Sequence, residues 1–161
     1  MKIRTFPVAV AIAFAATALT AHDYKVGDLV IDHPMAFETA KTAQTGGGFM
    51  TITNNGTEDD TLISVNADFP RVEIHTTEMD GDIARMMKVE GITVPAGETV
   101  ALEPGGFHVM FMGLRGDPFE VGEEIPATLT FENAGDLSIL FTVEKRSMDH
   151  GTMDHSGHGD S

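Results

Sequence analysis

Residues 71–89 read RVEIHTTEMDGDIARMMKV, two segments joined at Asp80-Gly81. Polar and apolar residues alternate along both segments, which is typical of β-strands with one face toward a core. An Asp-Gly pair favours the tight loop of a two-residue β-hairpin. With Asp80 and Gly81 in that loop, His75 would lie directly opposite Met86, with Cβ atoms about 5 Å apart. The stretch therefore predicts a hairpin with a histidine and a methionine on its polar face.

Similar short segments continue on both sides of this hairpin, separated by turn residues rich in glycine, asparagine and proline. The triple glycine at residues 46–48 is interpreted as one of these turns. Many short strands at a spacing of about 8–12 residues predict an all-β sandwich or barrel without helices. The expected strands are residues 29–32, 49–53, 61–65, 71–79, 83–89, 98–102, 107–112, 127–132 and 137–144.

A second histidine–methionine pair lies in residues 107–112, which read FHVMFM. Because strand side chains alternate between faces, the phenylalanines should face the core, and His108 and Met110 should face outward. Together with the hairpin this gives the spacing His-x10-Met-x21-His-x-Met, with the candidate ligands His75, Met86, His108 and Met110. Thioether sulfur suits Cu(I) and is a poor ligand for hard cations such as magnesium or calcium. The four residues therefore predict a Cu(I) site.

The other methionines before residue 147 fall into two groups, according to the strand face on which they are expected. Met79 and Met112 share the faces of the candidate ligands and are candidate rim ligands, whereas Met50 and Met87 are expected to fill the core. The chain has no cysteine, which excludes a blue-copper centre with its cysteine thiolate. No nucleophile or base gathers with the ligands, so we do not expect an enzyme.

The first 21 residues have the layout of a secretory signal. Lys2 and Arg4 precede an apolar run at residues 6–19, and small residues lead up to Ala21. Cleavage is expected after Ala21 or after Ala18. Because no cysteine lies near either position, we expect an exported, soluble protein without a lipid anchor.

Cleavage after Ala21 would leave a folded domain, residues 22–146, and a tail. It would also leave a free amine beside the imidazole of His22, a candidate Cu(II) chelate. The tail, residues 147–161, reads SMDHGTMDHSGHGDS and has too little apolar surface to order itself, so it is expected to be disordered. Its repeated Met-Asp-His predicts a Cu(II) site. The candidate tail ligands are Met148, His150, Met153, His155 and His158.

The chain carries a formal net charge of −15. So much negative charge argues against binding to nucleic acid or to an anionic membrane surface, because both require basic patches. Solubility alone accounts for such acidity, and so does attraction of metal cations or of a basic protein partner. Both interpretations stay open.

The ligand spacing and its flanks resemble the periplasmic copper chaperones of the PCu(A)C family. The flanks include FMTITNNG at residues 49–56, RVEIH at residues 71–75 and PGGFHVM at residues 104–110. The resemblance covers residues 28–144 and implies a cupredoxin-like Greek-key β-barrel that binds Cu(I) through the four candidate ligands. One departure is PMAF at residues 34–37, where family members commonly show Pro-Trp-Ala-Arg.

The resemblance also implies a role in the periplasm. Members of the family hold copper there and help to load the dinuclear copper centre of cytochrome c oxidase, often with a thioredoxin-fold assembly factor. The expected partners are therefore a copper-accepting oxidase subunit or such a factor, and the apo protein is expected to be a monomer. A copper-scavenging or tolerance protein that sequesters the metal without delivering it is the main alternative. A β-sandwich adhesion module that needs no metal is a third.

Overall fold

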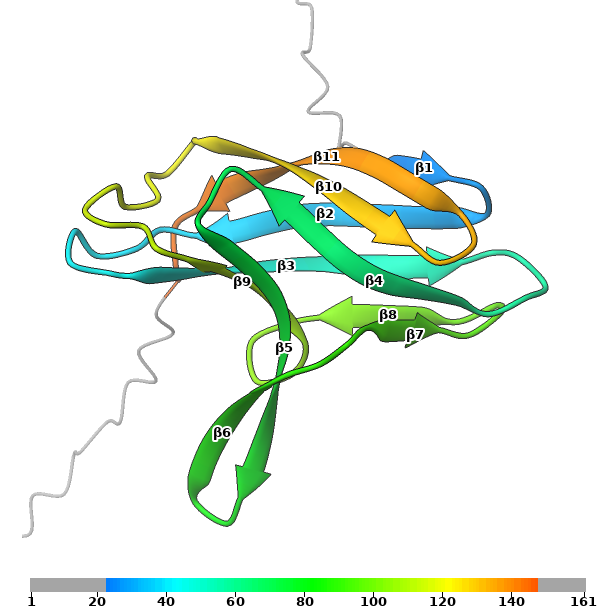
Figure 1. The fold of residues 1–161 in the computed structure, drawn as a ribbon, viewed down its shortest axis with the longest axis horizontal. Coiled ribbons are helices and arrows are strands. Elements are labelled where there is room, and N and C mark those ends of the chain that lie inside the picture. Colours follow the sequence, from blue (N-terminus) through cyan, green and yellow to red (C-terminus); the bar gives the residue numbers. More distant parts are fainter. Residues whose placement is uncertain (1–22, 148–161) are drawn as a thin grey trace, which may run out of the picture.

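The computed structural model describes residues 23–147, and all regular structure in this range is β (Figure 1). Across the same residues there is no helix that could span a membrane. The all-β class predicted from the sequence is confirmed. The strands are β1 (Tyr24–Val26), β2 (Leu29–Phe37), β3 (Thr45–Asn54), β4 (Asp60–Ala67), β5 (Arg71–Asp80), β6 (Ile83–Lys88), β7 (Ile92–Val94), β8 (Thr99–Leu102), β9 (His108–Met112), β10 (Glu124–Phe131) and β11 (Gly135–Glu144).

Hydrogen bonds join these strands into one sheet. Its order within residues 23–147 is β6-β5-β9-β3-β2-β11-β10-β4-β7, with β1 paired to β2 and β8 paired to β3. The pairing of β11 with β2 is parallel, whereas the hairpin pairs β5–β6 and β10–β11 are antiparallel. The sheet folds over itself around one core, and the β5–β6 hairpin projects away from the rest (Figure 1).

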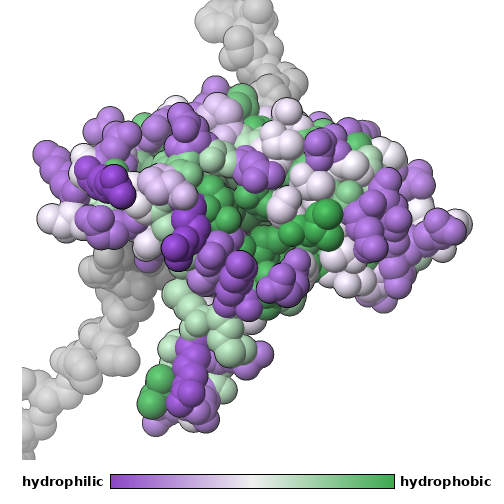
Figure 2. Space-filling model, in the orientation of Figure 1, coloured by the Kyte–Doolittle hydropathy of each residue, from purple (hydrophilic) through white to green (hydrophobic). Residues whose placement is uncertain are grey.

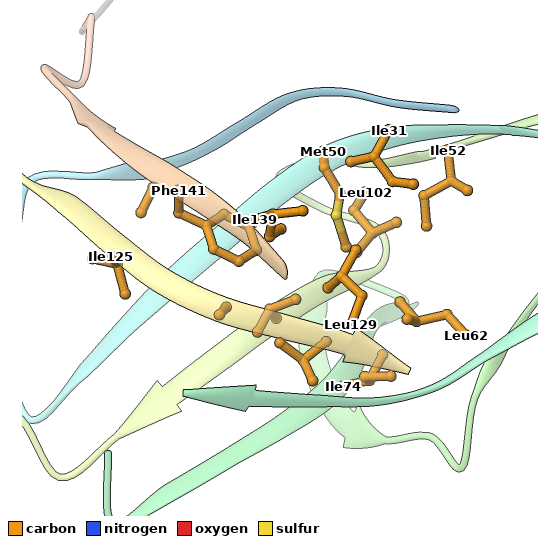
Figure 3. Close-up of a cluster of buried hydrophobic side chains, with 14 of the residues drawn as sticks. Ile31, Met50, Ile52, Leu62, Ile74, Leu102, Ile125, Leu129, Ile139 and Phe141 are labelled. Atoms are coloured by element: carbon orange, nitrogen blue, oxygen red, sulfur yellow. The ribbon is translucent and has the colours of Figure 1, made fainter. Parts of the chain in front are cut away.

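The core is built from aliphatic and phenylalanine side chains. Ile52 of β3, Leu102 of β8 and Leu129 of β10 gather there (Figure 3). Phe111 and Phe141 pack edge to face, with ring centroids 5.5 Å apart. Each such side chain stabilises the fold by about 1.5–3 kcal/mol when it is fully buried. The fold therefore rests on apolar packing, since the chain has no cysteine for a disulfide.

Each of the nine strands expected from the alternation is present, and the predicted ends either coincide with the observed ones or differ by at most five residues. The alternation does not predict β1 and β7. Both have three residues, too few for a period of two to stand out.

The three glycines at residues 46–48 lie inside β3, so their interpretation as a turn is wrong. A Cβ atom at Gly46 would lie 2.3 Å from the Phe119 ring, and one at Gly48 would lie 2.9 Å from the Phe111 ring. Glycine occupies these strand positions because aromatic rings approach the backbone closely.

Candidate metal centre

The register of the β5–β6 hairpin differs from the predicted one. Met86 pairs with Thr77, and the loop consists of Gly81 and Asp82. The prediction that His75 lies directly opposite Met86 is therefore wrong. Gly81 has a φ of +65° and comes first in the loop, as a type II′ turn requires. Because the pairing shifts by an even number of residues, Met86 stays on the face of His75, as its diagonal neighbour.

The two histidines face each other across neighbouring strands. β5 and β9 pair His75 with His108, and they pair Glu73 with Met110. The imidazole centroids are 5.9 Å apart. Met110 follows His108 by two residues, so strand alternation places its side chain on the same face. Two predicted ligands of β9 thus lie beside the predicted ligand of β5.

Each imidazole uses one nitrogen in a hydrogen bond and leaves the other unused. His75 Nε2 donates to Glu73 Oε2 at 2.9 Å, and His108 Nδ1 donates to the Gly106 carbonyl at 3.1 Å. His75 Nδ1 and His108 Nε2 are buried, and neither has a hydrogen-bond partner among the described residues. A neutral imidazole that donates from one nitrogen presents a lone pair on the other, as a metal ligand requires. Buried polar atoms without partners are uncommon, so these two nitrogens fit a bound cation.

Glu73 fixes the orientation of His75. Its carboxylate accepts the hydrogen bond from His75 and lies 3.7 Å from Lys88 Nζ. The hydrogen bond from His75 holds the pKa of Glu73 below the ordinary glutamate value, with a further contribution from Lys88. A charged carboxylate selects the His75 tautomer with Nδ1 as the ligand atom. The signal for this role in the sequence is the Glu-x-His spacing, which places both side chains on one face of a strand.

Replacing Glu73 by alanine is expected to weaken Cu(I) binding by about 10–100-fold, the usual cost of losing a partner that orients a metal ligand. Competition with a Cu(I) chelator measures the change. Glu73→Gln keeps an acceptor for His75 and should lose less. Glu78→Ala is the control, because Glu78 is exposed on the opposite face of the same strand. Equal affinities for Glu73→Ala and Glu78→Ala would contradict the orienting role.

A cleft of about 340 Å³ opens between the hairpin and the neighbouring ends of β3 and β9. Met86, His108 and Met110 line it, and Phe37 and Phe49 form part of its wall. Three of the four predicted ligands therefore border one cavity. Across the part of the chain that the structure describes, no three His, Asp or Glu side chains group as a metal site. The soft donors that line this cavity beside His108 are the thioethers of Met86 and Met110.

The ligands differ in exposure. His108 is 5% exposed and the His75 side chain 13%, whereas Met86 is 62% exposed. The prediction that His108 faces outward is therefore wrong, and Phe107, expected in the core, is only half-buried. Alternation gives the face of a strand but not what covers that face. Phe49 lies beside His108, with ring centroids 6.4 Å apart.

The two candidate rim ligands, Met79 and Met112, do not line the cleft. Met79 shares the hairpin face of Met86 and is 65% exposed, and Met112 pairs with Arg71 of β5. Met50 is buried in the core, as predicted. Met87 is 43% exposed, so the prediction that it fills the core is wrong, because the hairpin extends beyond the core. The candidate His22 and the candidate tail ligands lie outside the described residues.

This fold and its cleft have counterparts among known proteins. A family model described as "Putative lipoprotein LpqE-like" matches residues 29–143. The chain belongs to the LpqE-like family. One relative of this LpqE-like chain, "Putative lipoprotein Lxx21020" of Leifsonia xyli subsp. xyli (strain CTCB07), is 34% identical over 74 residues. The match covers 45% of this chain and 44% of the relative, so it spans less than half of that relative's length.

Solved PCuAC domains share the fold of this LpqE-like chain. The apo PCuAC domain from PmoF1 is 27% identical, with a TM-score of 0.68 over 78% of this chain and 100% of that domain. The copper-bound PCuAC domain from PmoF2 is 29% identical, with a TM-score of 0.66 over 78% of this chain and 99% of that domain. Cu(I)-bound DR1885 from Deinococcus radiodurans is 28% identical, with a TM-score of 0.59 over 82% of this chain and 87% of that protein. The predicted resemblance to PCu(A)C proteins and the cupredoxin-like fold are confirmed. Family and fold are of the copper-binding, chaperone-like type.

Proposed function

We propose that this chain is a periplasmic copper chaperone that carries Cu(I) between His75, Met86, His108 and Met110. The observation that carries the proposal is the pair of buried imidazole nitrogens without partners, His75 Nδ1 and His108 Nε2. The second of them belongs to a histidine that lines the cleft together with both thioethers. Copper-bound members of the same structural group, at 28% and 29% identity, support copper as the cargo.

The donor set suits Cu(I) chemically. Thioethers are neutral and need no deprotonation, so only the two histidines must be unprotonated for binding. The bound ion would keep its single positive charge. The carboxylate of Glu73, which accepts a hydrogen bond from His75, would balance that charge. Because no ligand is a thiolate, the site contains nothing that an oxidising compartment would convert to a disulfide. These properties favour a carrier over an enzyme.

The acceptor in this proposal is the dinuclear copper centre of cytochrome c oxidase, reached directly or through a thioredoxin-fold assembly factor. Transfer would proceed by exchange of one ligand at a time, and the exposed Met86 is the ligand that an acceptor reaches first. Each tenfold higher Cu(I) affinity of the acceptor makes the free energy of transfer more favourable by about 1.4 kcal/mol. The alternative function is sequestration, in which copper stays bound.

A transfer experiment separates delivery from sequestration. The Cu(I)-loaded full chain is mixed with an apo copper-accepting oxidase subunit, the proteins are separated, and copper is measured in each. A chaperone is expected to lose most of its Cu(I) to the subunit, and a sequestering protein would retain it. A His108→Ala chain, loaded in the same way, controls for copper that is bound outside the centre.

The tail is proposed to bind Cu(II) separately from the core centre. Histidine and aspartate are harder donors than thioether and suit Cu(II) better, and tethering would raise the copper concentration near the cleft. Deletion of residues 147–161 is expected to remove Cu(II) binding and to leave Cu(I) binding intact, as equilibrium titration with each ion would measure. Loss of both activities would contradict this division.

A further inference from the structure

The β5–β6 hairpin exposes a group of large apolar side chains. The exposed fractions are 65%, 61%, 62% and 43% for Met79, Ile83, Met86 and Met87. Figure 2 shows apolar residues on this projecting part of the molecule. Every residue of β6 is exposed, so core packing does not account for them. Exposed apolar groups that cluster in this way mark sites of interaction, and three of these four side chains carry a thioether.

The hairpin register brings two of the thioethers to one face. Met79 lies opposite Ala84, and Met86 lies opposite Thr77. Met79 and Met86 are therefore diagonal neighbours on the face of the metal centre. Diagonal neighbours in an antiparallel pair are about 7–8 Å apart, within reach of two long side chains. The residues directly opposite, Ala84 and Thr77, are small and leave room between the two sulfurs.

Met86 is common to this pair and to the cleft. It lines the cleft with His108 and Met110. His108 is 5% exposed, and Met79 is 65% exposed. The donors therefore run from buried imidazoles to an exposed sulfur, with Met86 between them. A soft ion can exchange a nitrogen ligand for the Met79 sulfur while Met86 stays bound.

We propose that Met79 and Met86 form an outer Cu(I) position through which copper enters and leaves the centre. This proposal rests on the proposed function and deepens it. The step is a series of ligand exchanges: a bond from Cu(I) to Met79 Sδ forms, the bond to Met86 Sδ is kept, and the bonds to the two histidine nitrogens and to Met110 Sδ break one after another. Copper remains Cu(I), and no proton moves, because both sulfurs are neutral thioethers. The positions that the two histidines and Met110 vacate are then open to donor atoms of the acceptor.

Release of Cu(I) from the loaded full chain to the chelator bicinchoninate tests this proposal. Met79→Leu keeps the size of the side chain and removes the sulfur. We expect it to slow release by about tenfold, the effect of a modest rise in the barrier, while the equilibrium Cu(I) affinity changes by less than about twofold. Met87→Leu is the matched control, because Met87 lies opposite Thr76 on the other face of the same hairpin. It should release copper at the wild-type rate.

Three results would overturn the outer position. The first is an unchanged rate of Cu(I) release in Met79→Leu, and the second is an equal slowing of release in Met87→Leu. The third is a large loss of equilibrium Cu(I) affinity in Met79→Leu, because it would make Met79 a ligand of the inner centre. Methyl NMR during titration with Ag(I), a closed-shell mimic of Cu(I), gives a second readout. The Met79 and Met86 methyl signals should shift together, and a shift of Met86 without Met79 would count against the proposal. Failure of the wild-type chain to bind Cu(I) would instead refute the proposed function itself.

Discussion

Cu(I) binding at the core centre is expected to be lost when Met86 and Met110 are both replaced by alanine. The double variant leaves two imidazoles and removes both sulfurs that line the cleft. The loss of Cu(I) affinity should be larger than the roughly 10–100-fold loss expected when only a residue that orients a ligand is removed. A Cu(I) competition titration of the full chain measures both affinity and stoichiometry. The number of Cu(I) ions bound per chain should fall by one, the ion of the core centre.

The matched control is Met87→Ala/Met112→Ala, which removes the same number of thioethers from the hairpin and from β9. Met87 is on the opposite hairpin face, and Met112 does not line the cleft. This variant should keep wild-type Cu(I) affinity. Unchanged binding in Met86→Ala/Met110→Ala, with or without a loss in the control, would place the copper site elsewhere.

Phe111→Ala is expected to lower the free energy of unfolding by about 3–5 kcal/mol, the usual cost of removing a buried phenylalanine from a core. Phe111 is 0% exposed and packs edge to face against Phe119 and Phe141, with ring centroids 5.7 and 5.5 Å apart. Phe111 is paired on β3 with Gly46, and Gly48 also approaches its ring, so neither of these positions offers a side chain that could fill the space. Urea denaturation followed by circular dichroism measures the change.

Val121→Ala is the control for this stability change. Val121 is 57% exposed, so its truncation should alter the free energy of unfolding by no more than about 0.5 kcal/mol. A loss in Phe111→Ala as small as that in Val121→Ala would contradict the packing described for β9. Phe111 lies between Met110 and Met112, so a measurable loss of Cu(I) affinity is also expected in this variant.

The properties that the sequence predicts correctly here are local ones. Alternation in β5, β6 and β9 places His75, Met86 and Met110 on shared faces, because side-chain direction has a period of two along any strand. The same alternation gives the all-β class and the existence of nine strands. The spacing of the two histidine–methionine pairs gives the resemblance to PCu(A)C proteins, which the solved structures confirm.

The sequence does not predict features that depend on contacts between distant segments. It also does not predict which two neighbouring residues form the loop of a hairpin. The hairpin register depends on which residue takes a positive φ, and Gly81 takes it at the first loop position. The burial of His108 depends on Phe49, which arrives from β3. The role of Gly46 in β3 depends on the Phe119 ring, which no local pattern would place there.

β6 ends the sheet order within residues 23–147, so one of its backbone edges has no neighbouring strand there. Such an edge invites a strand of another molecule to add, which is a route to aggregation. Arg85 and Lys88 stand on this strand with side chains 63% and 56% exposed, and charges of this kind discourage the addition. The β5–β6 hairpin, which carries Met79 and Met86, thus remains accessible to a single ion. The charges on β6 oppose the growth of fibrils from its edge.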